Sequence, residues 1–165
     1  MIMNVKQFNY YIDLMRRGDC LGVQKIQYEY LYPIKYTALK NVDDLEIADD
    51  AISSVMAYIT HNSRKLGYIE KPGEFIYTVT DKITKNYKHT PGNKPIKYIS
   101  DKEKQLALRF SQLPENEQET FLLFSCYLME DGEISKFLNR PAEVITAEIN
   151  SAAQKLDDLA EMFEK

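Results

Sequence analysis

Apolar side chains recur every three or four positions along the first third of the chain, the spacing that lines one face of an α-helix. This repeat predicts three amphipathic helices, at residues 5–15, 23–38 and 45–59. Gly18 is expected to end the first helix, and Asp19 is placed to cap the second. Pro33 is expected to kink the second helix. Asp43 and Glu46 have the spacing of a capping box before the third.

The middle of the chain is less regular. Residues 61–73 hold asparagine, glycine and proline and are predicted to form a loop. Residues 74–89 have apolar side chains at helical spacing, although Phe75, Tyr77 and Val79 also alternate as they would in a strand. A helix is favoured because the surrounding segments are helical. Residues 90–95, Thr-Pro-Gly-Asn-Lys-Pro, have the composition of a linker.

The remainder of the chain returns to helical spacing. Ser100 and Glu103 form a capping-box pattern before a fifth helix, and Pro114 is expected at the first position of a sixth. Gly132 separates the sixth helix from a short one, and Pro141 starts the last. The sixth helix is predicted to have an apolar face of Phe121, Leu122, Phe124 and Leu128.

The chain is therefore predicted to be all-α. The simplest account has two small helical domains, at residues 1–89 and 100–165, joined by a linker at residues 90–99.

Charge is unevenly distributed along the 165 residues, whose net charge is −4. Residues 61–97 carry 8 basic and 3 acidic side chains, whereas residues 98–165 carry 7 basic and 14 acidic. A compact basic block between two acidic segments indicates a local surface that faces an anion. A solvated lysine-rich loop and helix is the simpler explanation.

Several classes of protein are disfavoured. No apolar run is long enough to cross a bilayer, and the first ten residues do not resemble a signal peptide. Cys20 and Cys126 lie far apart, so reduced thiols in a cytoplasmic protein are expected rather than a disulfide or a zinc site. No phosphate-binding loop, nucleophile elbow or zinc-protease motif is present. We therefore expect neither an enzyme nor a bound cofactor or metal.

The end of the chain has the dimensions of a helix-turn-helix. A short helix, a tight turn and a second helix are predicted between Glu133 and Leu156. In that motif the first turns of the second helix contact base edges in the major groove of DNA. Two packed helices also occur in many proteins that bind no nucleic acid.

Motifs in both halves resemble sigma factors of the extracytoplasmic-function (ECF) group, the small promoter-recognition subunits of bacterial RNA polymerase. Leu113-Pro114-Glu115 and the helix from Gly132 to Leu138 resemble the family's fourth conserved region. Arg16-Arg17-Gly18-Asp19, the aromatic segment from Tyr28 to Tyr36, and Ala48 to Met56 resemble its second region. The motifs keep their common order from residue 5 to residue 160.

The resemblance implies binding to the clamp helices and flap of core RNA polymerase, recognition of promoter DNA, and regulation by an anti-sigma factor. The polymerase-binding positions would be Asp49, Asp50, Ser53, Ser54 and Met56. Melted DNA of the minus-ten element would meet the basic block and its aromatic side chains, at Arg64, Lys65, Tyr68, Lys71, Tyr77, Lys82, Lys85 and Lys88. The helix-turn-helix would contact duplex DNA through Arg140, Thr146, Glu148, Asn150 and Ser151.

Three departures from the family pattern support an alternative. Ser53 and Ser54 replace a Gln-Glu pair, and Lys82 replaces an asparagine. In the recognition helix Glu148 is expected to face phosphates, which it would repel unless it accepts a hydrogen bond from a cytosine amino group. The alternative is a sigma-like protein repurposed as a protein-binding transcription regulator without promoter readout.

Overall fold

The fold is entirely helical over the residues that the structure, a computed structural model, describes: 2–87 and 99–164, with side chains described as far as residue 156. The all-α prediction is confirmed for that part of the chain, whereas the linker at residues 90–95 lies outside it. The elements are α1 (Val5–Arg16), α2 (Cys20–Val42), α3 (Leu45–Asn62), the 3₁₀ turn η1 (Ser63–Lys65), α4 (Pro72–Lys85), α5 (Asp101–Gln112), α6 (Glu115–Ser125), α7 (Asp131–Leu138) and α8 (Ala142–Glu164).

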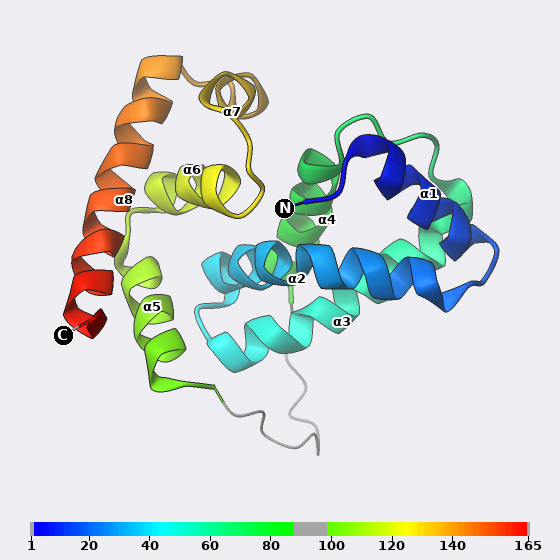
Figure 1. The fold of residues 1–165 in the computed structure, drawn as a ribbon, viewed down its shortest axis with the longest axis horizontal. Coiled ribbons are helices and arrows are strands. Elements are labelled where there is room, and N and C mark those ends of the chain that lie inside the picture. Colours follow the sequence, from blue (N-terminus) through cyan, green and yellow to red (C-terminus); the bar gives the residue numbers. More distant parts are fainter. Residues whose placement is uncertain (1, 88–98, 165) are drawn as a thin grey trace.

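The long helix α2 organises the first half, with α1, α3 and α4 arranged around it (Figure 1). Its first turn is capped as predicted, since the Asp19 side chain accepts a hydrogen bond from the Leu21 amide. Gly22 allows α2 to approach α1, because a Cβ atom there would collide with the Tyr11 carbonyl oxygen. Pro33 lies inside α2 without ending it, and its carbonyl accepts a 2.6 Å hydrogen bond from the Thr37 hydroxyl.

Two predicted boundaries differ from the structure. Asp43 does not cap α3; it ends α2 in the left-handed conformation, and the next residue, Asp44, accepts the capping bond from Ile47. Residues 61–73 are only partly a loop, because α3 and η1 continue to Lys65 and α4 begins at Pro72. The favoured helix at residues 74–89 is confirmed as a helix rather than a strand, and it spans Pro72–Lys85.

The second half consists of α5 to α8, with α6 between α2 and α8. Ser100 caps α5 by accepting from the Glu103 amide, as predicted, while Pro114 precedes α6 by one residue. The predicted apolar face of α6 is partly wrong, since Phe124 and Leu128 are exposed. A helix packed on two sides buries more than one stripe, and the side chains buried on α6 are Glu117, Gln118, Thr120, Leu122 and Leu123.

The two groups of helices share one continuous hydrophobic core. Aromatic rings join them, with ring centroids 5.8 Å apart for Tyr36 and Phe110 and 5.7 Å apart for Tyr77 and Phe137. The Tyr127 hydroxyl lies 2.7 Å from the Thr37 hydroxyl, inside the same core. The division into two domains stays a prediction, and in this arrangement the halves are in direct contact.

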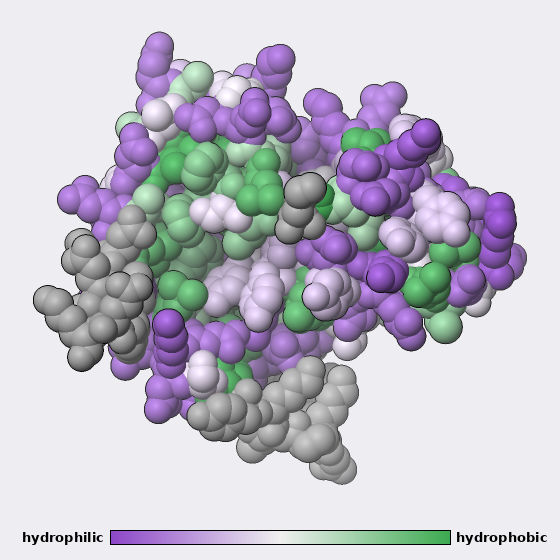
Figure 2. Space-filling model, in the orientation of Figure 1, coloured by the Kyte–Doolittle hydropathy of each residue, from purple (hydrophilic) through white to green (hydrophobic). Residues whose placement is uncertain are grey.

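Hydrophobic surface remains on the outside of this fold. On the face shown in Figure 2 it gathers mainly over the C-terminal helices, whereas polar residues dominate the region of α1. The exposed large apolar side chains of the C-terminal half are Leu106, Leu108, Phe124, Leu128 and Val144. No helix among the described residues is both long enough and apolar enough to span a membrane.

Candidate functional site: polymerase and nucleic-acid interfaces

Tyr77 is buried where the two groups of helices meet. It is 4 % exposed, accepts a 2.9 Å hydrogen bond from Lys40 Nζ, and donates a 2.7 Å bond to Glu119 of α6. Burial, followed by the bond to Glu119, raises the pKa of the Tyr77 hydroxyl well above its usual range, so the phenol stays protonated. The ring that was predicted to stack on a DNA base is not accessible in this arrangement.

Asp81 completes the N-terminal side of this polar cluster. Lys40 Nζ and the Asn41 amide donate to the same Asp81 oxygen at 2.9 and 3.0 Å, and Lys85 pairs with its other oxygen at 2.9 Å. Burial raises the pKa of Asp81, but the bonds from Asn41, Lys40 and Lys85 outweigh it and hold the pKa below its usual value. Lys85, predicted to face DNA, is therefore already paired with a carboxylate.

Arg140 and Glu148 form an inward ion pair at the start of α8. Arg140 Nη1 donates to both Glu148 carboxylate oxygens at 2.8 and 2.9 Å, and Arg140 Nη2 donates to Glu119 at 3.2 Å. The Thr120 hydroxyl also donates to Glu148, at 2.5 Å. Glu148 is 8 % exposed because it shares a helix face with the buried Ile145. The expectation that Glu148 faces phosphates is wrong for this structure.

The predicted short helix, turn and second helix are present. α7 ends at Leu138, its C-cap Asn139 is in the left-handed conformation (φ 55°), and α8 begins at Ala142. Thr146 and Asn150 are exposed on the outer face of α8, while Ser151 is half-buried and donates to Glu117 at 2.8 Å. The Thr146 hydroxyl donates to Asp131 at 2.6 Å. Residues 142–154 contain no lysine or arginine, so this face offers duplex DNA no cation of its own.

The other basic-block residues lie on separate stretches of the chain. Arg64 and Lys65 are exposed on η1, and Tyr68 is 67 % exposed in the following loop. Lys71 precedes α4 and lies 3.8 Å from Glu74, whereas Lys82 is exposed near the end of α4. The remaining predicted lysine, Lys88, lies outside the described residues.

Arg16 holds the loop that carries Tyr68. Its guanidinium donates to the carbonyl oxygens of Ser63, Leu66 and Gly67 at 2.9, 2.6 and 3.2 Å. Three backbone acceptors fix the course of the chain after η1. The sequence singled out Arg16 only as part of a junction motif, because nothing local shows that its partners lie about fifty residues away.

A shallow groove lies between α2 and α3, with a volume of about 560 Å³. Of the predicted polymerase-binding residues, Ser53 and Met56 line it. Met56 is 3 % exposed, so only a small part of its side chain is accessible in the groove, whereas Ser53 is exposed. Asp49 and Asp50 are half-buried, as is Ser54, and Asp49 lies 3.7 Å from Lys35. The groove residues that the sequence did not suggest are Val23, Gln27, Ala57, Thr60 and His61.

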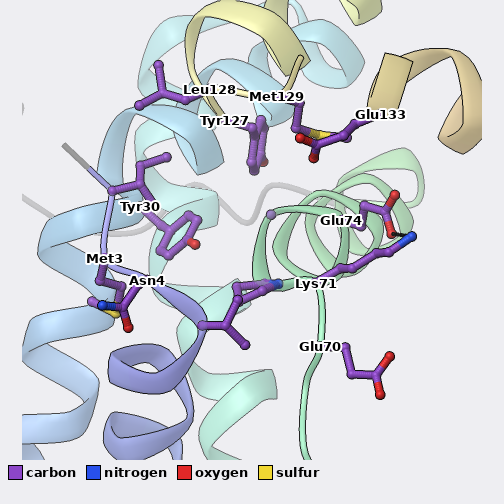
Figure 3. Close-up of a pocket in the computed structure, with 14 residues that line it drawn as sticks. Met3, Asn4, Tyr30, Glu70, Lys71, Glu74, Tyr127, Leu128, Met129 and Glu133 are labelled. Carbon is purple, nitrogen blue, oxygen red and sulfur yellow. Dashed lines mark ion pairs between the residues drawn. The ribbon is translucent and has the colours of Figure 1, made fainter. Parts of the chain in front are cut away.

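A second, deeper pocket of about 400 Å³ lies between the two groups of helices (Figure 3). Its walls come from the start of α1, from α2, from the start of α4 and from the turn between α6 and α7. Tyr30 and Tyr127 contribute aromatic surface, and Met3 and Met129 contribute thioethers. No sequence motif indicates this pocket, because its residues come from distant segments.

No protein-family model matches the chain, and no curated protein matches it significantly.

Proposed function

We propose that this protein is a sigma factor of the ECF type, which binds core RNA polymerase and directs promoter recognition and transcription initiation. The observation that carries the proposal is the groove between α2 and α3. Ser53 and Met56, two positions that the resemblance assigns to polymerase contact, line this groove together with the apolar Val23 and Ala57. A helix of a partner protein can bury apolar side chains in such a groove.

The rest of the chain supplies parts that this function needs. The helix-turn-helix of α7 and α8 has the geometry for contact with a second partner, either the polymerase flap or duplex DNA. Arg64, Lys65 and the exposed Tyr68 provide cations and a stacking ring for unpaired DNA.

The test of polymerase binding is co-elution of the purified chain with core RNA polymerase on a sizing column. We expect a stoichiometric complex, which Ser53→Arg weakens by about 30-fold, because a charge buried in an apolar interface costs roughly 2 kcal/mol. Ser125→Arg is the matched control, since Ser125 is also exposed on a helix but lies in the other half. Absence of a complex at micromolar concentrations would refute the proposal, as would equal loss in both variants.

A second candidate is the sigma-like regulator that binds a protein and reads no promoter. The inward Arg140–Glu148 pair and the burial of Tyr77 favour this regulator, because residues that were predicted to contact DNA contact other protein residues instead. Run-off transcription by the reconstituted complex separates the two candidates. A specific transcript supports the sigma factor, whereas stable polymerase binding without any transcript supports the regulator.

A further inference from the structure

We propose that the pocket between the two groups of helices binds an organic cation, an ammonium or guanidinium group on an apolar body. The proposal does not depend on the function proposed above. It rests on three features of the pocket: a tyrosine hydroxyl that opens on it without a protein partner, an aromatic and thioether lining, and a carboxylate in its wall.

The hydroxyl belongs to Tyr30, which is 1 % exposed. No hydrogen bond among the described residues involves its Oη atom, although the neighbouring Tyr127 hydroxyl is bonded to Thr37 and lies 3.3 Å from the Pro33 carbonyl oxygen. Thr80 Oγ1 is the only fully enclosed side-chain polar atom without a partner in the described chain, so Tyr30 Oη retains access to the pocket. Figure 3 shows this hydroxyl turned toward the start of α4. A hydroxyl that opens on the pocket and has no protein partner is free to accept a hydrogen bond from a ligand.

The lining favours a cation with an apolar body. Tyr30 and Tyr127 lie with ring centroids 6.5 Å apart, and Met3 and Met129 add polarisable surface beside them. The face of an aromatic ring attracts a cation, most strongly where water is excluded. The volume of about 400 Å³ lies in the range of small-molecule sites.

The charged side chains at the rim of the pocket also favour a positively charged ligand. Figure 3 shows the Glu133 side chain extending from α7 toward Tyr127 and Met129, and Glu133 has no ion-pair partner among the described residues. Glu74 and Lys71 at the rim lie 3.8 Å apart and offset each other, while Glu70 points away from the other labelled side chains. The pocket thus offers a cationic ligand two acceptors, the Glu133 carboxylate and the Tyr30 hydroxyl oxygen.

Such a ligand would join the two halves of the fold. Tyr30 lies on α2 and Glu133 on α7, so a molecule that contacts both links the N-terminal and C-terminal helices. A ligand that binds only while the two groups of helices are in contact stabilises that contact by mass action.

The test is a titration of the full chain, labelled with ¹³C at the methionine methyl groups, with phenethylammonium. Met3 and Met129 line the pocket, whereas Met15 and Met56 are buried elsewhere and serve as internal controls. We expect the first two signals to shift and the controls to stay in place. The anionic analogue 3-phenylpropionate and the neutral 2-phenylethanol keep the ring and change the charge, and we expect the cation to bind more tightly than either.

Two variants test the assigned contacts. Tyr30→Phe removes only the hydroxyl and should weaken phenethylammonium binding about fivefold, the range of one hydrogen bond. Tyr28→Phe is the matched control, because Tyr28 is 79 % exposed on the same helix and should leave affinity unchanged. Glu133→Gln should weaken the cation about threefold and leave 2-phenylethanol unaffected.

Two results would overturn the proposal: equal affinity for all three probes, or unmoved Met3 and Met129 signals at about 20 mM ligand, well above the concentration that fills a millimolar site. A parallel titration with an acetylated and amidated Phe-Arg dipeptide identifies the source of the cation. Binding tighter than that of phenethylammonium assigns the pocket to a basic side chain of a partner, and weaker binding assigns it to a free organic amine.

Discussion

Replacing Glu148 by alanine tests whether α8 packs against the rest of the fold through this acidic residue. In the structure Glu148 accepts two bonds from Arg140 and one from Thr120, and it is 8 % exposed. The substitution leaves the Arg140 guanidinium with its 3.2 Å bond to Glu119, and the Thr120 hydroxyl can turn to donate to the Asn116 carbonyl oxygen, 2.7 Å away. The local cost is therefore the loss of one buried partner and not the collapse of the whole cluster.

The expected loss in the free energy of unfolding follows from these contacts. Breaking a fully buried ion pair by removing one partner costs about 3–5 kcal/mol, because the other charge is left uncompensated. The Arg140 side chain is 25 % exposed and keeps Glu119, so water and the second carboxylate offset part of this cost. We expect Glu148→Ala to lower the free energy of unfolding by about 2–3 kcal/mol.

The assay is urea denaturation followed by circular dichroism. With a slope of about 2 kcal/mol per molar urea, the midpoint should fall by about 1 M. Glu143→Ala is the matched control, since Glu143 is exposed on the same helix and the change in helix propensity is the same. A loss below about 0.5 kcal/mol for Glu148→Ala, the size expected of a surface change, would refute the inward orientation. A double-mutant cycle with Arg140→Met should give a coupling energy of about 1–2 kcal/mol.

Three further predictions concern other groups. Tyr77→Phe keeps the ring contacts but leaves Glu119 without its hydroxyl donor, and the free energy of unfolding should fall by about 1–2 kcal/mol in the same urea assay. The pKa of Asp81 is held below its ordinary value, so this carboxylate stabilises the fold above its unfolded-state pKa of about 3.9. The stabilisation is lost as pH falls through the lower folded-state pKa. When the urea midpoint is compared between pH 5 and pH 2.5, the Asp81→Asn variant should therefore lose less stability than the native chain. Desolvation of the half-buried Cys126 raises the pKa of its thiol to about 12, whereas Cys20 is exposed. Iodoacetamide at pH 8 should therefore add one label to the native chain and two in urea, counted by mass spectrometry, and two labels without urea would contradict the raised pKa of Cys126.

Local sequence signals were sufficient to predict a helix cap, because the capping side chain and the backbone amide that it bonds are close in sequence. The caps at Asp19 and Ser100 were predicted correctly, because a capping side chain bonds an amide two or three residues away. The same rule missed by one residue at Asp43 and Asp44, where either aspartate could cap and the left-handed end of α2 decided between them. The helix at residues 72–85 was favoured over a strand from its surroundings, and that preference was correct.

The site was predicted less completely. Ser53 and Met56 do line one groove, but Val23 and Gln27 from α2 complete it, and their proximity depends on how two helices pack. Tyr77 and Glu148 were expected at DNA-facing surfaces, and both are buried against residues of other helices. Hydrophobic periodicity gives the buried face of each helix, yet it does not tell which polar side chains will meet partners there.

The sequence by itself therefore determined that the described part of the chain is helical, where the caps at Asp19 and Ser100 lie, and that the fourth helix carries part of the basic block, Lys82 and Lys85. Those properties depend on contacts within a few positions, which propensity, capping and periodicity describe. Only the tertiary structure decided that Lys40, Tyr77, Glu119 and Arg140 form one polar cluster across the two halves, and that Tyr30 and Glu133 line the same pocket. The physical reason is that a buried polar or charged group requires a specific partner, and that partner can come from any part of the chain that the packing brings near.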